Sequence, residues 1–199
     1  NPYSCWVDEF SNLYFVDAYD NTINFISYLD LWSGFTNYFY TLYSRTDDHK
    51  YINIPVGISV YDSEDLYFVN NEVDEVAGVV NKAEAFTKGD NADTVQQEVK
   101  GKVGAWGLAV SEDYVHFTTT DGSLWSLDRD DKSDTVERVK GLLEDPRGLC
   151  YGDDTVYVAD FAGGKIYEFD DDDDEEEEAD DLDIWTAIDH PYALYCVNW

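Results

Sequence analysis

The feature of this sequence that most constrains its fold is a repeat of about 40 to 55 residues, which occurs four times and begins a fifth. Each copy opens on a short apolar segment that is usually led by glycine. These opening segments are Tyr3–Trp6, Gly57–Val60, Gly107–Val110, Gly148–Tyr151 and Ala193–Cys196. Repeats of this length usually stack on their neighbours, because one unit alone cannot bury its apolar face.

A second segment in each repeat is rich in aromatic and β-branched residues, which favour a sheet buried on both sides. The four copies are Leu13–Asp17, Leu66–Asn70, Tyr114–Thr118 and Val156–Asp160. Turn pairs follow them, at Asp20-Asn21, Asn70-Asn71, Asp121-Gly122 and Gly163-Gly164. Such pairs tolerate positive φ and close tight hairpins, so each second segment is predicted to turn directly into a third strand.

The rest of each repeat completes a four-stranded pattern. Third strands are predicted at 23–26, 76–80, 124–127 and 166–169, and fourth strands at 38–43, 95–99, 136–139 and 184–188. Only Ala83–Phe86 suggests a turn of helix. The pattern predicts an all-β chain, a β-propeller of four four-stranded blades plus the first strand of a fifth.

The predicted organisation is a single propeller domain over residues 1–199. Its blades span about 2–45, 55–101, 105–142 and 146–188, with an extra strand at 191–198 and an acidic loop at 170–183. A chain of this length can bury a sizeable single core.

One stretch carries a family resemblance. Val156–Phe169, preceded by Pro146–Leu149, resembles an NHL-type propeller repeat, and Leu13–Ile23 is similar. The same residues resemble the related YWTD and gluconolactonase/strictosidine-synthase propellers. Repeats two and three depart from the motif at its Asp, which is replaced by Asn70 and Thr120.

The resemblance implies six blades, or sometimes five, whereas this chain encodes four. Two interpretations stay open. The chain is part of a longer propeller whose other blades lie elsewhere, or four blades close alone and the strand Tyr192–Val197 packs beside repeat one. We favour the first, because a closed ring does not need two first strands.

The charge of the chain restricts its partners. Asp and Glu total 44 against 12 Lys and Arg, which gives a net charge of −32. Nucleic acid and anionic membranes are disfavoured as partners because like charges repel. Basic proteins, divalent cations and high salt suit such a surface, and a halophilic origin is a minor alternative.

A run of nine acidic residues lies inside repeat four, between its third and fourth strands. It comprises Asp170, Asp171, Asp172, Asp173, Asp174, Glu175, Glu176, Glu177 and Glu178. The plainer interpretation is a solvated loop. The alternative is docking of a basic partner or diffuse Ca²⁺ binding, which would be weak because the spaced ligands and glycine of an EF-hand loop are missing.

The three cysteines, Cys5, Cys150 and Cys196, all lie in first strands. Cys150–Cys196 would link neighbouring blades, Cys5–Cys196 would join the two ends, and buried free thiols are the third interpretation. No Cys-x-x-Cys pair is present, which disfavours a zinc or redox site. We expect an extracellular, secreted protein, since the absence of methionine suits a mature chain whose signal was removed.

An enzymatic function finds little support in the residues. The resemblance to gluconolactonase-like propellers implies a divalent metal held by Glu, Asn and Asp, but repeat one has no Glu in its first strand. Ser59, Ala109 and Cys150 stand in the later first strands. A zinc lyase would need converging histidines; His49 and His190 both precede a first strand, whereas His116 lies within a second strand.

A binding role remains. The face that propellers use for ligands would present Asp17, Asp20, Asn21, Asp47, His49, Asn70, Asn71, Asp121, Asp160, Asp189 and His190. The plainer interpretation is that these turn residues bond their own backbone, and the alternative is an acidic rim for a basic or calcium-bridged partner. The aromatic segment Leu31–Tyr43 adds Trp32 and Phe35 as interface candidates.

The sequence therefore predicts a non-enzymatic, acidic β-propeller that serves as an extracellular protein-interaction or structural module, assisted by calcium. Its partners would be proteins that are basic or that supply further blades, in homo- or hetero-assemblies. The alternative is a metal-dependent propeller hydrolase or lyase, gluconolactonase-like, with its site at the central channel. The fold alone does not decide between them.

Overall fold

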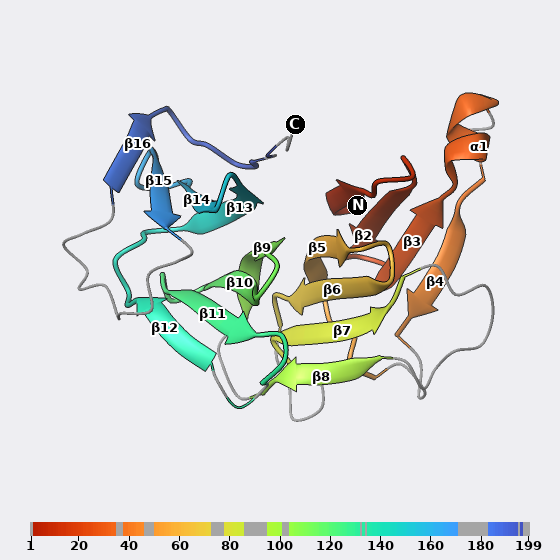
Figure 1. Cartoon of the computed structure of the whole chain (residues 1–199), viewed down its shortest axis with the longest axis horizontal. Helices are drawn as coiled ribbons and strands as arrows, with labels where there is room; N and C mark the ends of the chain where they lie inside the picture. Colours follow the sequence, from red (N-terminus) through yellow and green to blue (C-terminus); the bar gives the residue numbers. More distant parts are fainter. Residues whose placement is uncertain are drawn as a thin grey trace. The chain divides into compact units, whose positions relative to one another are not determined.

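The computed structural model describes residues 2–34, 38–45, 50–72, 78–85, 95–100, 104–131, 133, 135–170, 183–194 and 196. These residues form four four-stranded antiparallel sheets, and in each sheet the strands lie in chain order (Figure 1). The predicted all-β fold of four propeller blades is thereby confirmed. The chain divides into two compact units, Asn1–Gly104 and Ala105–Trp199, and each unit contains two blades.

The first unit contains blades 1 and 2. Blade 1 consists of β1 (Pro2–Val7), β2 (Leu13–Asp17), β3 (Thr22–Ile26) and β4 (Tyr40–Ser44), with the helix α1 (Tyr28–Trp32) between β3 and β4. Blade 2 consists of β5 (Pro55–Tyr61), β6 (Asp65–Asn70), β7 (Val80–Glu84) and β8 (Gln96–Val99). One core joins the two blades, and it includes Tyr14, Val16, Ile23 and Phe25 from blade 1 and Ile58, Val60, Leu66 and Phe68 from blade 2.

The second unit contains blades 3 and 4. Blade 3 consists of β9 (Ala105–Val110), β10 (Tyr114–Thr119), β11 (Leu124–Asp128) and β12 (Thr135–Val139). Blade 4 consists of β13 (Pro146–Gly152), β14 (Thr155–Asp160), β15 (Lys165–Asp170) and β16 (Asp183–Ala187). Their shared core includes Ala109, Leu124, Val139 and Leu143 from blade 3 and Leu149, Val156, Val158 and Phe169 from blade 4.

The repeated glycine of the first strand allows close packing between neighbours. A Cβ atom added to Gly107 in β9 would lie 3.0 Å from the Cβ of Leu149 in β13. A Cβ added to Gly148 would lie 2.9 Å from the Cα of Ala193. The segment around Ala193 therefore lies beside β13 much as β13 lies beside β9, although the structure assigns no strand to Pro191–Leu194 or Cys196.

Two local predictions were wrong. The third strand of blade 2 is β7 (Val80–Glu84), whereas the sequence suggested 76–80, and Ala83 lies in this strand and not in a turn of helix. Residues 73–77 and Phe86 lie outside the described residues. The polar stretch Asn81–Glu84 lacks the apolar alternation of a strand, and its pairing with β6 over Asp65–Val69 determines its structure instead.

The structure also contains a helix that the sequence pattern did not indicate. The side chain of Ser27 caps α1, because its Oγ accepts a hydrogen bond from the backbone N–H of Asp30 and donates one to the Asp30 carboxylate. A serine followed three residues later by an acidic residue is a known helix-start signal. A helix of five residues is too short to show helical periodicity.

Candidate functional site

Each blade has an irregularity at the start of its first strand. The pairing register between the first and second strands shifts at Pro2/Ser4, Pro55/Gly57, Phe117/Thr119 and Pro146/Gly148. The residues at these shifts are Tyr3, Val56, Trp106 and Arg147. A bulge redirects the side chains around it, so all four blades direct an equivalent residue away from the regular pleat.

In the second unit, these redirected side chains form a cluster around Arg147. Its guanidinium carbon lies 4.8 Å from the ring centroid of Trp106, 4.8 Å from that of Phe161 and 5.3 Å from that of Tyr192. Trp106, Arg147 and Tyr192 occupy the same position in three successive repeats. We call Arg147 and these three aromatic residues the arginine cluster. The ring of His190 lies next to it, with its centroid 5.0 Å from that of Phe161.

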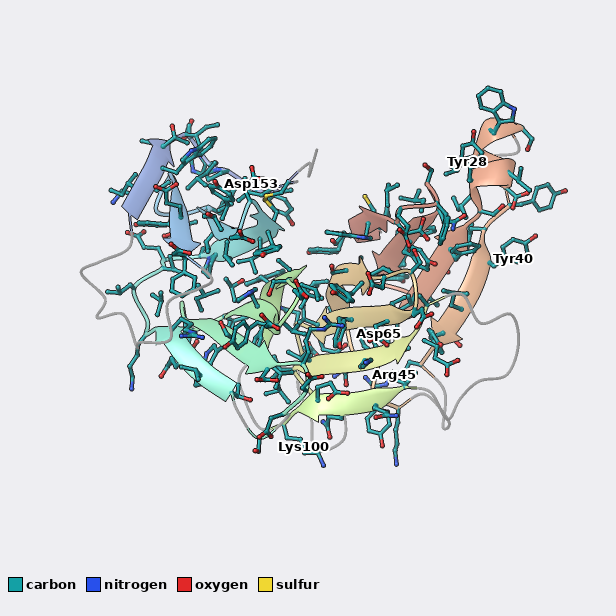
Figure 2. All side chains as sticks on the ribbon, in the orientation of Figure 1. Tyr28, Tyr40, Arg45, Asp65, Lys100 and Asp153 are labelled. Carbon is teal, nitrogen blue, oxygen red and sulfur yellow. A yellow bond between two sulfur atoms is a disulfide. The ribbon has the colours of Figure 1, made fainter. Side chains whose placement is uncertain are left out.

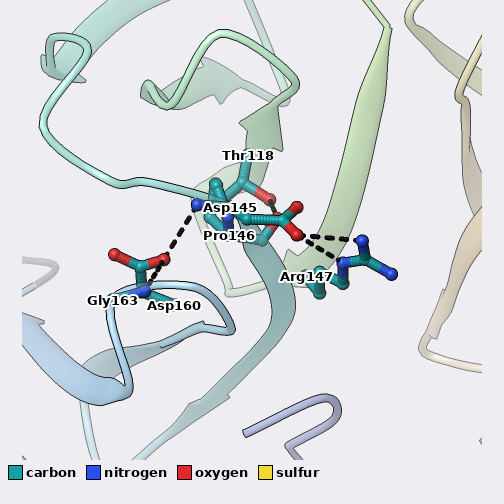
Figure 3. A network of polar contacts seen from close by, with 6 residues as sticks. All are labelled: Thr118, Asp145, Pro146, Arg147, Asp160 and Gly163. Carbon is teal, nitrogen blue, oxygen red and sulfur yellow. Dashed lines mark hydrogen bonds and ion pairs between the residues drawn. The ribbon is translucent and has the colours of Figure 1, made fainter. Parts of the chain in front are cut away.

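Asp145 holds the cation of the arginine cluster (Figure 3). The Nε atom of Arg147 donates to Asp145 Oδ2 over 3.0 Å, and Nη2 lies 2.9 Å from the same oxygen. This hydrogen bond raises the pKa of Arg147 above its ordinary value, against a smaller effect of burial. The guanidinium is therefore fixed in orientation and paired in charge.

Asp160, a ligand-face candidate, supports the loop that leads into the arginine cluster. Its carboxylate accepts hydrogen bonds from the backbone N–H groups of Glu144 (3.0 Å), Asp145 (2.9 Å) and Gly163 (3.2 Å). The side chain is buried. Nearby, Thr118 Oγ1 donates to the carbonyl of Pro146 and so ties β10 to the start of β13 (Figure 3).

The first unit brings three candidates together around residues 53–54, which lead into β5. The amide oxygen of Asn70 accepts from the N–H of Asn53, that of Asn21 accepts from the N–H of Ile54, and the N–H of Asn71 donates to the Ile54 carbonyl. Asn70 Nδ2 also donates to the carbonyls of Tyr51 and Gly78. The amide oxygens of Asn70 and Asn21 therefore hold the backbone of residues 53–54, which are 17 and 33 positions away, and not that of their own turns; Asn71 contributes its backbone N–H.

The remaining candidates of this face are local turn residues. Asp17 Oδ1 accepts hydrogen bonds from the N–H groups of Tyr19 and Asp20, and Asp121 Oδ1 accepts one from the hydroxyl of Thr119. The register shows that Thr119, and not Thr120, occupies the motif's Asp position, because Thr119 pairs with Ala105 as Asp160 pairs with Pro146.

Of the predicted metal ligands, the structure describes His190 and Asp170. His190 pairs through Nδ1 with the carboxylate of Asp189, and both side chains are exposed. His49, Asp47 and residues 171–178 lie outside the described residues, whereas Asp170 ends β15. Among the described residues, no three His, Cys, Asp or Glu side chains are placed to hold one metal ion.

The cysteines divide into a pair and a single thiol. Cys150 and Cys196 form a disulfide across a sequence separation of 46 residues, with their Cα atoms 5.5 Å apart. It ties the segment after β16 to β13. Cys5 is a free and exposed thiol on β1.

The part of blade 1 formed by α1 and the residues at the start of β4 exposes large apolar side chains. We call it the aromatic edge; it consists of Tyr28, Leu29, Leu31 and Trp32 in α1 and of Tyr38, Phe39 and Tyr40 at the start of β4. Trp32 is 78% exposed, and no residue of α1 is buried. Figure 1 shows α1 projecting from the end of the blade where β3 and β4 meet, and Figure 2 labels Tyr28 and Tyr40 there. Phe35 lies outside the described residues.

A buried polar group in the second unit was not recognised from sequence. His116 Nδ1 lies 3.0 Å from Ser126 Oγ, which also accepts a hydrogen bond from Arg138 Nε. The Arg138 guanidinium carbon lies 5.5 Å from the ring centroid of Tyr114 and 5.9 Å from that of Phe169. His116 was correctly placed within a strand, but the hydroxyl that it contacts belongs to Ser126, ten positions away on the next strand.

Comparison with known proteins identifies the fold. No family model matches the sequence, and no curated protein is recognisably similar to it in sequence.

Among the described residues, no helix is long and apolar enough to span a membrane.

Several solved structures share the architecture. A gluconolactonase from Xanthomonas campestris matches with a TM-score of 0.70 and 15% identity, over 96% of this chain and 64% of that one. A virginiamycin B lyase from Staphylococcus aureus matches with a TM-score of 0.67 and 14% identity, over 96% of this chain and 58% of that one. A chain of a nidogen/laminin complex matches with a TM-score of 0.65 and 13% identity, over 92% of this chain and 62% of that one.

This chain thus spans less than two thirds of each of these proteins. Their functions differ from one another, and at these identities the likeness extends to the fold only. The chain has the β-propeller fold.

Proposed function

We propose that this chain is a non-enzymatic, acidic β-propeller module that binds another protein outside the cell. The observation that supports the proposal is the aromatic edge of blade 1. Its helix α1 contributes no buried residue to the core, yet four of its five residues are Tyr, Leu, Leu and Trp. Because these side chains do not pack in the core of blade 1, contact with a partner is the best physical reason for their presence.

The composition of this surface suits a protein contact. Trp and Tyr are enriched among the residues that dominate binding energies, because each buries a large rigid area at low entropic cost. The outer strands of blades 2 and 3 differ, since β8 reads Gln-Gln-Glu-Val and β12 reads Thr-Val-Glu-Arg-Val. An apolar edge is therefore not a general requirement of a blade in this chain.

The charge of the chain defines the complementary partner. A surface of net charge −32 attracts basic groups and repels acidic ones. The fitting partner has an apolar centre that covers Trp32 and its neighbours, with Lys and Arg around it. The arginine cluster fits this role less well, because its one cation is already paired with Asp145.

The proposal also includes weak calcium binding and an extracellular location. Ca²⁺ binds diffusely to the acidic run 170–178 and lowers the repulsion between this chain and its partner. An extracellular location agrees with the Cys150–Cys196 disulfide, because structural disulfides persist mainly in oxidising compartments.

A defined pair of peptides tests the proposal. One is a cationic amphipathic peptide of alternating Leu-rich and Lys-rich turns, and the other has the same charge but Gly and Ser in place of Leu. Fluorescence anisotropy should show binding of the first at least about tenfold tighter than of the second, since burial of an aromatic anchor is worth more than about 1.4 kcal/mol. Trp32→Ala should abolish this preference.

Trp185→Ala provides the matched control, because Trp185 is an exposed tryptophan on β16 in the other unit. This variant should bind both peptides as the unchanged protein does. Equal affinity for the two peptides, or equal loss in both variants, would show that only net charge matters and would contradict the proposal.

The alternative function needs a separate measurement. A metal-dependent propeller hydrolase or lyase should retain one tightly bound divalent metal per chain after dialysis, and it should lose activity on removal of the metal. Elemental analysis of the dialysed protein decides this. We expect no stoichiometric metal, and only weak calcium binding that millimolar EDTA reverses.

A further inference from the structure

The arginine cluster presents aromatic rings and a fixed ion pair to solvent at one place in the second unit. Trp106 and Phe161 are half-buried, and Tyr192 is 45% exposed. The side chains of Arg147 and Asp145 are each 25% exposed. Ring faces and charged groups are therefore accessible together.

The fold does not require these residue types at this position. The equivalent residue of blade 2 is Val56, which lies at the same register shift and is 4% exposed. A small, buried apolar side chain is thus sufficient at the start of a first strand. Partly exposed aromatic rings beside a few fixed polar groups are instead typical of ligand sites.

Other contacts hold the arginine cluster in place before any ligand binds. Asp145 orients the guanidinium of Arg147, and Asp160 in turn accepts a hydrogen bond from the N–H of Asp145. The Cys150–Cys196 disulfide ties the segment that carries Tyr192 to β13. Side chains that are already fixed lose little entropy on binding, which favours affinity.

The charges around the arginine cluster favour a neutral ligand. Asp145 already pairs with the charge of Arg147, so an anion finds no unpaired cation there. Glu144 and Asp189 lie exposed next to the cluster and would repel an anion as well. A cationic ligand would instead have to approach the guanidinium at the centre.

The ion pair also decides which kind of neutral ligand fits. An apolar ligand over Arg147 and Asp145 would remove water from both charges without replacing it, which costs free energy. A hydroxyl group can replace that water, since it can donate to a carboxylate and accept from a guanidinium. Among the described residues, both contacts of Arg147 with Asp145 use Oδ2, which leaves Oδ1 as an acceptor for such a hydroxyl.

We propose that the arginine cluster binds a neutral carbohydrate. The apolar C–H face of one sugar ring stacks on Tyr192, the most exposed ring of the cluster, and its hydroxyl groups bond to Asp145 and Arg147 (Figure 3). The site lies in the second unit, whereas the aromatic edge lies in the first. The inference therefore does not depend on partner binding at the aromatic edge.

Isothermal titration calorimetry with hexasaccharides of defined charge tests this proposal on the whole chain. The neutral probes are hexamers of glucose, mannose, galactose and N-acetylglucosamine, and the acidic probe is a hexamer of galacturonic acid. We expect at least one neutral probe to bind with a Kd below about 1 mM, and the acidic probe to bind at least about tenfold more weakly.

Variants of Tyr192 test the position of the sugar. Tyr192→Ala should weaken binding of the neutral probe by about tenfold or more, because the stacking ring is removed. Tyr192→Phe should retain most of the affinity, because the ring stays. Tyr19→Ala is the matched control, since Tyr19 is an exposed tyrosine in the turn between β2 and β3 of the first unit. Circular dichroism confirms that each variant is folded.

A charge variant tests why the ligand is neutral. Asp145→Asn leaves the guanidinium of Arg147 without its counter-charge, so the acidic probe should bind this variant at least about tenfold more tightly than it binds the unchanged protein. An unchanged affinity in the folded variant would contradict the assignment of Arg147 and Asp145 to the site.

Salt and the aromatic-edge variant separate this site from the proposed protein contact. Binding of the neutral probe should be equal in about 0.05 and 0.5 M NaCl, whereas binding of the cationic peptide should weaken with salt. Trp32→Ala should leave sugar binding unchanged, and Tyr192→Ala should leave the peptide preference unchanged. Either proposal can therefore fail without the other.

Three results would overturn the proposal. The first is failure of every neutral probe to bind at about 10 mM, and the second is an affinity that Tyr192→Ala does not change. The third is loss of sugar binding in Trp32→Ala, which would assign the sugar to the aromatic edge instead.

Discussion

At the scale of single residues, the same repeat position serves one purpose through different chemistry. Asp160 and Asn70 both end a second strand and both fix the segment that leads into a first strand. Asp160 only accepts hydrogen bonds, from three backbone N–H groups. Asn70 accepts one and donates two, to the carbonyls of Tyr51 and Gly78. The two side chains are therefore not interchangeable.

We expect both Asp160→Asn and Asn70→Asp to destabilise the fold by about 1–3 kcal/mol, because each leaves a buried polar group facing another of its own kind. In Asn70→Asp, carboxylate oxygens would face two carbonyl oxygens. Urea unfolding measures the loss. Asp20→Asn, at an exposed turn residue, should stay within about 0.5 kcal/mol of the unchanged protein; equal small effects at all three positions would contradict this role.

Arg147 is expected to tolerate substitution poorly even when its charge is kept. Lysine cannot stack a flat cation against Trp106 and Phe161, so Arg147→Lys should lower the free energy of unfolding by about 1–2 kcal/mol. Chemical denaturation followed by tryptophan fluorescence provides the measurement. Arg45→Lys is the matched control at an exposed site, and an equal effect there would show that stacking in the arginine cluster contributes nothing.

The ionisation of Tyr14 should affect the free energy of unfolding at alkaline pH. Burial raises the pKa of Tyr14 above its ordinary value of 10.0, and the nearby negative charge of Asp8 raises it further. The folded state thus favours the protonated phenol, so this contribution is complete below about pH 10 and is lost as the pH rises above it. Tyr14→Phe should therefore show a shallower loss of stability above about pH 10 in pH-dependent unfolding, while Tyr19→Phe should behave like the unchanged protein. An unchanged slope in Tyr14→Phe would contradict the assignment.

The sequence revealed these residues only in part. Asp160 and Asn70 were identified as polar residues at strand ends, because strand and turn chemistry is local. The arginine cluster was missed, since it forms from Trp106, Arg147 and Tyr192. Each of these follows the previous one by more than 40 residues, and they meet only when successive blades stack. The shared position of these three residues after a proline or before a glycine is the signal that could have revealed it.

At the scale of elements, strands with clear aromatic or β-branched patterns were predicted well. β2, β6 and β14 match the predicted segments to within one residue. β7 was displaced because Asn81–Glu84 has no strand-like composition and is held by pairing with β6. α1 was missed because one capped turn leaves no periodic signal in the sequence.

The disulfide is the covalent link between elements, and its effect should be large. It closes a loop of 46 residues, and restricting the unfolded chain to that loop is worth about 4 kcal/mol by chain entropy. A reductant should therefore lower the free energy of unfolding by about 2–4 kcal/mol. Thermal unfolding with and without reductant measures this change.

The double variant Cys150→Ser/Cys196→Ser is the control for the disulfide. It should unfold like the reduced protein and should be insensitive to the reductant. If the oxidised and reduced proteins were equally stable, the segment after β16 would not depend on this bond for its attachment.

At the scale of the whole molecule, the repeat pattern predicts the fold, whereas the net charge restricts the possible partners. The repeat pattern was sufficient for the propeller fold, because each repeat specifies the same four-stranded blade. The net charge of −32 restricts the partners but not the fold. What the protein binds depends on which apolar surfaces stay exposed, and this follows only from the packed structure.

The central claim is that the protein contacts its partner through the aromatic edge of blade 1. Hydrogen exchange with and without the cationic amphipathic peptide tests it most directly, because exchange maps protection onto individual segments. We expect added protection in α1 and β4, and none around Arg147 and Tyr192. Protection at the arginine cluster instead, with α1 and β4 unchanged, would contradict the claim and move the binding site to the second unit.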